Sequence, residues 1–220
     1  MKEKTITQLK LGVLGGGQLG KMLSIAAAPL SIDIELMESE TGMLEKGVAC
    51  KRHFGDLSDY NQVLEFGKTK DIVTIEKEDV NVEALRALKE SGIKVCPDPE
   101  SLAIIQDKYK QKCFYKENGF ATPKFYNISK TALIEKVLKG EQSLPFVLKH
   151  RTSGYDGKGV AIIRTKEDLD PLPEKDYMVE VFVKIQKELS VIGARNAKGQ
   201  IELYEVTEPF ADPSGFLMTS

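Results

Sequence analysis

Apolar positions in the first hundred residues alternate between short continuous runs and stretches with helical spacing. Continuous runs cover residues 9–14 and 32–37, and an Ala-rich stretch between them carries apolar side chains at helical spacing. This pattern predicts a strand, a turn, a helix and a second strand, which together form a β-α-β unit. The same patterns predict helices at residues 59–66 and 82–91 and strands at 71–75 and 93–96. Strands that alternate with helices indicate a parallel sheet covered on both faces.

The pattern changes after Pro97 and Pro99, which interrupt the rhythm and place a boundary nearby. Residues 100–118 predict a helix that stops at Gly119, and an extended segment follows. From Leu144 onward, short β-rich runs separated by turn signals predict antiparallel hairpins. We therefore predict an α/β chain with a Rossmann-like parallel-sheet domain, a helical linker and an α+β unit, at residues 1–98, 99–143 and 144–220.

Composition excludes several classes of protein. Hydrophobic residues make up 41% and charged residues 29% of the chain, and 31 Lys and Arg oppose 33 Asp and Glu. This balance is typical of a globular protein and argues against a nucleic-acid surface. Three cysteines without a C-x-x-C pair predict neither a disulfide framework nor a zinc site. Because we find no membrane-length apolar run and no apolar targeting segment, we expect a cytoplasmic protein that binds no membrane.

A first glycine cluster follows the first predicted strand. Gly15, Gly17 and Gly20 satisfy G-x-G-x-x-G, where a helix N-terminus can receive an anion. Glu38 follows about 20 residues later, near the position of the ribose-binding acid in dinucleotide enzymes. Taken alone, the cluster leaves two interpretations open, namely an NAD-dependent oxidoreductase and glycines that only let strand and helix pack closely.

A second glycine cluster follows the predicted strand that carries Lys149. Gly154, Gly157 and Gly159 alternate with polar residues, so that successive backbone N–H groups can turn toward phosphate oxygens while lysines neutralise charge. No G-K-[ST] follows, which distinguishes the loop from a Walker A motif. We interpret the cluster as a hairpin loop that binds phosphate, and the alternative is a solvated hairpin tip without a ligand. Downstream, Glu180 ends one apolar strand and Glu188 begins the next. A carboxylate at such a strand end could accept hydrogen bonds from ribose hydroxyls, and the backbone at 181–183 could read an adenine edge; the alternative is solvated strand ends.

These motifs carry a family resemblance over about residues 9–195. Lys149, GYDGKG at 154–159, and EVFV at 180–183 followed by Glu188 resemble the nucleotide-binding half of ATP-grasp enzymes. The segments GGGQLGKM, VTIEKEDV and QDKYKQK narrow the resemblance to the 5-(carboxyamino)imidazole ribonucleotide synthetase family. The resemblance implies a pre-ATP-grasp domain followed by an ATP-grasp domain. It also implies a carbon–nitrogen ligase of purine biosynthesis that joins ATP, bicarbonate and 5-aminoimidazole ribonucleotide through carboxyphosphate.

The resemblance also implies roles for individual residues. Tyr155, Asp156 and Lys158 would act as catalytic residues beside carboxyphosphate, and Gly17, Gln18 and Glu76 would face the acceptor substrate. The residues implied to contact ATP are Lys108, Lys149, Gly154, Tyr155, Asp156, Gly157, Lys158, Gly159, Val160, Glu180, Val181, Phe182, Val183 and Glu188.

The family also uses Mg²⁺, whose acidic ligands would lie beyond Ser220. We therefore expect an ATP-grasp domain that is incomplete at its C-terminus, a truncated form with impaired activity and, because family members tend to be dimers, a homodimer. Two alternatives from other classes stay open, an NAD-dependent oxidoreductase and a non-catalytic nucleotide-binding or dimerisation remnant. The related glycinamide ribonucleotide transformylase shares the architecture, and only the short motifs argue against it.

Overall fold

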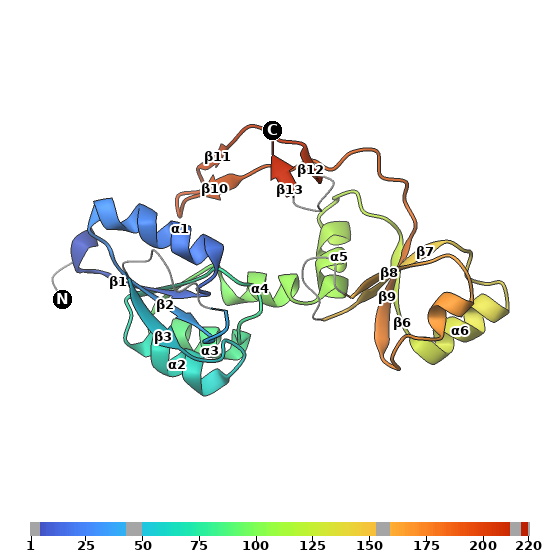
Figure 1. Cartoon of the computed structure of the whole chain (residues 1–220), viewed down its shortest axis with the longest axis horizontal. Helices are drawn as coiled ribbons and strands as arrows, with labels where there is room; N and C mark the ends of the chain where they lie inside the picture. The colour runs from blue at the N-terminus through green and yellow to red at the C-terminus, as the bar shows by residue number, and fades with distance from the viewer. Residues whose placement is uncertain (1–4, 43–49, 153–158, 212–216, 220) are drawn as a thin grey trace. The chain divides into compact units, whose positions relative to one another are not determined.

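The computed structural model describes residues 5–42, 50–152, 159–211 and 217–219, and it packs into two units, Met1–Val181 and Phe182–Ser220. Figure 1 shows the order of their elements along the chain.

The first unit begins with a five-stranded, wholly parallel sheet in the order β3-β2-β1-β4-β5. Its strands are β1 (Lys10–Leu14), β2 (Asp33–Glu38), β3 (Lys51–Phe54), β4 (Ile72–Ile75) and β5 (Lys94–Cys96). Because the strand order reverses beside β1, the crevice between the carboxyl ends of β1 and β4 is a topological switch point, where open α/β sheets bind ligands.

Three helices cover this sheet, and a short 3₁₀ helix precedes β1. They are η1 (Ile6–Gln8), α1 (Gln18–Ala27) with its extension η2 (Ala28–Leu30), α2 (Tyr60–Lys68) and α3 (Val82–Glu90). Adjacent residues of β1 belong to different cores, since Leu14 packs with α2 and α3 while Val13 packs with Ala27 of α1. Alternation along the strand therefore gives both sheet faces an apolar cover, which confirms the predicted α/β class.

Sequence patterns missed β3 and joined two helices into one. All four residues of β3 are exposed, so the strand lacks the alternation of buried and exposed residues by which a strand is predicted. The helix predicted at 100–118 is instead α4 (Pro99–Ile105) followed by α5 (Lys108–Glu117). The Asp107 side chain accepts hydrogen bonds from the backbone N–H groups of Tyr109 and Lys110, which starts a new helix at this point.

A second sheet of the first unit is antiparallel, with the order β6-β9-β7-β8. It consists of β6 (Phe125–Ser129), β7 (Phe146–His150), β8 (Val160–Ile163) and β9 (Asp176–Val181), with α6 (Lys130–Leu138) and η3 (Glu167–Leu169) in the connections. The hairpin of β7 and β8 matches the sequence prediction. By contrast, β9 lies between β6 and β7, so the sheet is not a series of sequential hairpins. The sequence analysis also did not predict α6. Leu133 and Val137 of α6 pack on Phe146 and Tyr177.

The second unit holds two small antiparallel pairs. The hairpin of β10 (Gly193–Arg195) and β11 (Ile201–Leu203) was predicted, and β12 (Pro209–Ala211) pairs with β13 (Leu217–Thr219). None of the side chains described in this unit is buried. Within the described parts of the whole chain, no helix has the length and apolar character needed to cross a membrane.

Candidate functional site

The first glycine cluster closes around a carboxylate. Gly15 has a φ of +124°, and a Cβ built there would lie 2.3 Å from Oε2 of Glu76, the residue after β4. A Cβ on Gly17 would lie 3.0 Å from Oε1 of the same side chain. We call Gly15, Gly17 and Glu76, together with Gln18 at the start of α1, the glycine corner. It lies at the switch point, where the carboxyl ends of β1 and β4 adjoin.

Glu76 has an acceptor that the protein leaves unfilled. Its Oε2 is buried, and no hydrogen-bond donor reaches it among the described residues. An unpaired buried carboxylate oxygen costs free energy, which a ligand N–H group could recover. Of the three residues implied to face the acceptor substrate, Glu76 thus has an unfilled acceptor and Gly17 lies against its carboxylate. The neighbouring Gly15, with its φ of +124°, is the position that requires glycine.

Glu38, the candidate ribose-binding acid, is engaged by the protein itself. It is 3% exposed, its Oε1 accepts from the backbone N–H and the hydroxyl of Ser39, and its Oε2 pairs with Lys77 and lies 3.4 Å from the Gly16 nitrogen. Burial alone would raise the pKa of Glu38, but Lys77 and these backbone donors outweigh it and hold the pKa below its ordinary 4.5. Glu38 therefore fastens β2 to the glycine turn and is not free to bind a ribose.

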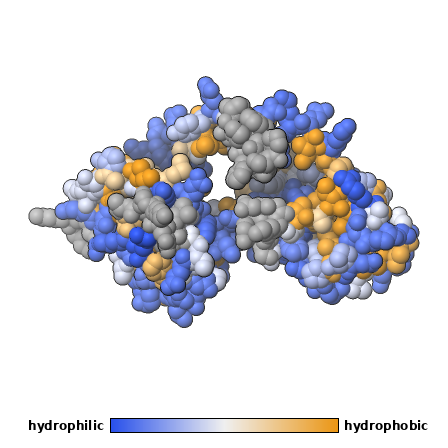
Figure 2. Space-filling model, in the orientation of Figure 1, coloured by the Kyte–Doolittle hydropathy of each residue, from blue (hydrophilic) through white to orange (hydrophobic). Residues whose placement is uncertain are grey.

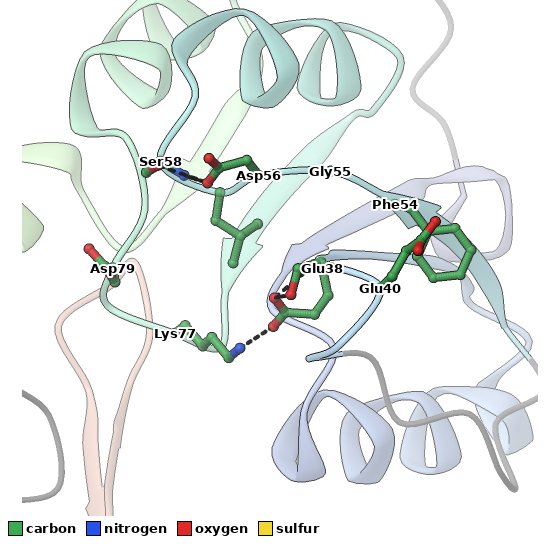
Figure 3. Close-up of a pocket in the computed structure, with 10 residues that line it drawn as sticks. Glu38, Glu40, Phe54, Gly55, Asp56, Ser58, Lys77 and Asp79 are labelled. Atoms are coloured by element: carbon green, nitrogen blue, oxygen red, sulfur yellow. Dashed lines mark hydrogen bonds and ion pairs between the residues drawn. The ribbon is translucent and has the colours of Figure 1, made fainter.

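A cavity of about 580 Å³ opens beside the Glu38–Lys77 pair. Figure 3 shows Lys77 reaching Glu38 and Asp56 bonded to Ser58; Glu40, Phe54 and Asp79 also line the cavity. The sequence analysis missed the cavity residues from 54 to 58 because it missed β3. The Gly-Asp pair directly after that strand, at 55 and 56, is the sequence feature that could have indicated a turn here.

A second cluster of charges lies on the antiparallel sheet. Glu180 of β9 is 4% exposed, with Lys112 Nζ 2.9 Å from its Oε1 and Lys149 Nζ 2.8 Å from its Oε2. The contact with Lys112 has ion-pair but not hydrogen-bond geometry. Burial would raise the pKa of Glu180, but the two ammonium groups outweigh it and lower that pKa. We call these three residues the lysine–glutamate cluster. In this structure the Glu180 carboxylate faces two lysines.

The backbone of Lys108 lies beside the end of β7, although the two are far apart in the sequence. Its backbone N–H donates to the Arg151 carbonyl over 2.9 Å, and Arg151 forms an ion pair with Asp107. At the other end of the loop, Gly159 has a φ of +80°, and a Cβ there would lie 2.9 Å from His150 Nδ1. Val160 and Val181 are both exposed. Lys108, Lys149 and the two ends of the second glycine loop thus gather near one end of β7.

The remaining candidates are not placed relative to these groups. Gly154, Tyr155, Asp156, Gly157 and Lys158 lie outside the described residues. Phe182, Val183 and Glu188 belong to the second unit, where Val183 and Glu188 are exposed. The roles assigned to all of these residues stay predictions.

Two family models together match most of the chain. The ribonucleotide synthetase preATP-grasp domain matches residues 8–106, and the ATP-grasp domain matches residues 113–214. The N5-carboxyaminoimidazole ribonucleotide synthase of Synechocystis is 33% identical over 201 residues, which cover 90% of this chain and 50% of the relative. The chain spans about half the length of the curated relatives it matches, between 36% and 59%.

Solved structures agree with these matches. The N5-carboxyaminoimidazole ribonucleotide synthetase of Thermotoga maritima superposes with a TM-score of 0.79 at 33% identity, covering 91% of this chain and 53% of that one. The Aspergillus clavatus enzyme, solved with ADP and 5-aminoimidazole ribonucleotide, has a TM-score of 0.80 at 25% identity and covers 97% and 56% of the two chains. The chain therefore belongs to the 5-(carboxyamino)imidazole ribonucleotide synthetase family of ATP-grasp proteins.

Proposed function

We propose that this chain contributes the acceptor-substrate site and part of the nucleotide site of an enzyme that carboxylates 5-aminoimidazole ribonucleotide with ATP and bicarbonate. The observation that carries the proposal is the Glu76 carboxylate held against Gly15 and Gly17, with Oε2 buried and unfilled. An acceptor amine has N–H groups to offer such an oxygen. The names of the relatives and the ligands of the Aspergillus clavatus structure support the same substrates.

The glycine corner argues against the dinucleotide alternative. In dinucleotide enzymes the pyrophosphate lies over the glycine turn at the helix N-terminus. Here a carboxylate lies over that turn, and it would repel the two negative phosphates. Glu38 is likewise saturated by Ser39, Gly16 and Lys77. A nicotinamide cofactor would therefore place its pyrophosphate against the Glu76 carboxylate and its ribose against Glu38, whose oxygens already have partners.

The lysine–glutamate cluster suits the nucleotide half of the reaction. A bicarbonate oxygen attacks the γ-phosphorus and the bond to the ADP oxygen breaks. The substrate amine then attacks the carboxyl carbon, the bond from that carbon to the phosphate oxygen breaks, and the departing phosphate takes the proton that the amine loses. In this proposal Lys108 and Lys149 neutralise the phosphate charge, and Glu76 accepts a hydrogen bond from the amine that attacks. Tyr155, Asp156 and Lys158 would face carboxyphosphate, as the family resemblance implies.

Magnesium would supply further neutralisation of the phosphates when bound. Among the described residues, no three His, Cys, Asp or Glu side chains gather into a possible metal site. The magnesium ion and a homodimer are therefore proposed from the family resemblance alone, and a cytoplasmic location stays the expectation from the sequence.

Thermal unfolding with ATP, with NAD⁺ and without ligand tests the proposal. A ligand at 100 times its Kd stabilises by about 2.7 kcal/mol, so ATP should raise the Tm while NAD⁺ should leave it unchanged. Two variants act as controls for each other. Glu76→Gln should weaken binding of 5-aminoimidazole ribonucleotide without changing ATP binding, and Lys149→Met should do the reverse. Stabilisation by NAD⁺ alone, or loss of both ligands in both variants, would refute the proposal.

A further inference from the structure

Glu180 has one more positive partner than its charge requires. Its single negative charge is buried between two ammonium groups, Lys112 from α5 and Lys149 from β7. Phe125 of β6 and Val147 of β7 are its register partners on either side, and neither is charged. Lys112 and Lys149 are the charged groups that act on the pKa of this carboxylate from the packed elements. The cluster thus carries a net charge of about +1 when all three groups are ionised.

The two lysines differ in how firmly they are held. The Lys112 side chain is 15% exposed, and its Nζ also donates to the Thr122 hydroxyl over 2.8 Å. The Lys149 side chain is 25% exposed, lies one residue before the end of β7, and has Glu180 as its ion-pair partner. Lys112 is therefore the fixed partner of Glu180, and Lys149 is the partner with room to turn elsewhere.

We propose that Lys112 is a positioning residue for nucleotide binding, which keeps Glu180 neutralised while Lys149 turns from the carboxylate to the phosphates. The inference rests on the proposed function, because it takes Lys149 as a phosphate contact. Without Lys112, each phosphate that recruits Lys149 would leave a buried carboxylate unpaired, and an uncompensated buried charge is costly. Lys112 therefore lets the Lys149 ammonium group move to the phosphates without leaving Glu180 unpaired.

The consequence for protons has a definite sign. In a Lys112→Met variant, Glu180 keeps Lys149 before ATP binds and loses it afterward. Burial without a cation raises a carboxyl pKa, so Glu180 would take up a proton when ATP binds. ATP affinity in this variant should then increase as the pH falls through the raised pKa, whereas the parent chain should show no such dependence from Glu180.

Calorimetric titration in buffers of different ionisation enthalpy measures both the ATP affinity and the number of protons taken up on binding, using the 220-residue chain. We expect Lys112→Met to weaken ATP binding by about tenfold or more at pH 8, where Glu180 stays ionised, because tenfold is the change in affinity that accompanies a one-unit rise in the Glu180 pKa. At lower pH, as the pH falls through the raised pKa, the variant should take up protons when it binds ATP. Adenosine, which has no phosphate to recruit Lys149, should bind both proteins alike. Lys112→Arg should restore the parent behaviour. Lys116→Met, which removes an exposed charge from the same helix, should have no effect.

Thermal unfolding without nucleotide gives a second readout. Lys149→Met imitates the state in which Lys149 has left, so alone it should lower the Tm little, because Lys112 remains. Combined with Lys112→Met it should lower the Tm by more than the two single changes together, and Glu180→Gln in the double variant should remove this excess.

Additive Tm changes, or equal ATP affinity without proton uptake in Lys112→Met, would overturn the positioning role while leaving the nucleotide site intact. Coupled Tm changes in a chain that ATP does not stabilise would refute the nucleotide site, and the positioning role with it. Coupling together with proton uptake supports both.

Discussion

At Gly15 a backbone requirement and a packing requirement fall on the same residue. The φ of +124° strains any side chain, and a Cβ would meet Glu76 at 2.3 Å. Gly92 has a similar φ of +92° but nothing within 4 Å of its Cβ position. The pair therefore separates the cost of the backbone conformation from the cost of displacing Glu76.

Substitution of these two glycines by alanine should differ in effect. We expect Gly92→Ala to lower the free energy of unfolding by about 1 kcal/mol, and Gly15→Ala to lower it by about 3 kcal/mol because Glu76 must also move. Urea unfolding measures both values. In a Glu76→Gly background, which removes the carboxylate and also the Glu76 Cβ that would lie 2.8 Å from the new methyl group, the extra loss at Gly15 should shrink; its full persistence would show that Glu76 is not the obstacle.

The break between α4 and α5 depends on Asp107, which serves two elements at once. Its carboxylate caps α5 through Tyr109 and Lys110, and both of its oxygens contact the Arg151 side chain just after β7, over 2.8 to 3.0 Å. Burial would raise the pKa of Asp107, but these partners outweigh it and lower that pKa. The cap thus fixes where α5 begins, and the ion pair holds that start against the end of β7.

Variants at Asp107 should separate the cap from the ion pair. Loss of a side-chain cap costs about 1 kcal/mol, and the pair adds about as much because Arg151 is partly exposed. Asp107→Ala should therefore lower the free energy of unfolding by about 2 kcal/mol, and Asp107→Asn, which can still cap, by about 1 kcal/mol. Denaturant unfolding at pH 7 gives both values, and equal losses in the two variants would mean that the cap contributes nothing.

Over the whole molecule, the described buried side chains are confined to the first unit. The buried hydrophobic residues fall between Val13 and Val179. The second unit instead exposes large apolar side chains, among them Ile185, Leu189 and Tyr204. Apolar side chains also gather on the outer face of α1, where Leu19, Met22 and Ile25 are more than half exposed (Figure 2).

A chain ending at Val181 should therefore keep its stability. Because the described residues beyond that point bury no side chain, we expect its free energy of unfolding to stay within about 1 kcal/mol of the 220-residue chain. Light scattering should also show less association, since exposed apolar surface is removed. Denaturant unfolding checks the first expectation, and a loss of cooperative unfolding would contradict it.

The elements of the parallel-sheet domain could be predicted from the sequence because burial repeats along each strand and helix. Strands β1, β2, β4 and β5 and helices α1 to α3 carry that repeat, and they formed near the predicted positions. Fully exposed β3 has no such repeat, and the split at Asp107 depends on one capping side chain within an otherwise helical run. Local sequence therefore determined the elements whose own residues supply the signal, together with the family to which the motifs belong.

Tertiary structure decided which of these residues meet. Glu76 lies on Gly15 because β4 pairs with β1, and Glu180 faces Lys112 and Lys149 because α5 packs beside a sheet in which β9 enters next to β7. The same packing assigned Glu38 to Lys77 and away from a ribose. Contacts between residues far apart in the chain leave no periodicity in the sequence, because their free energy comes from burial and charge pairing that exist only once the elements have assembled.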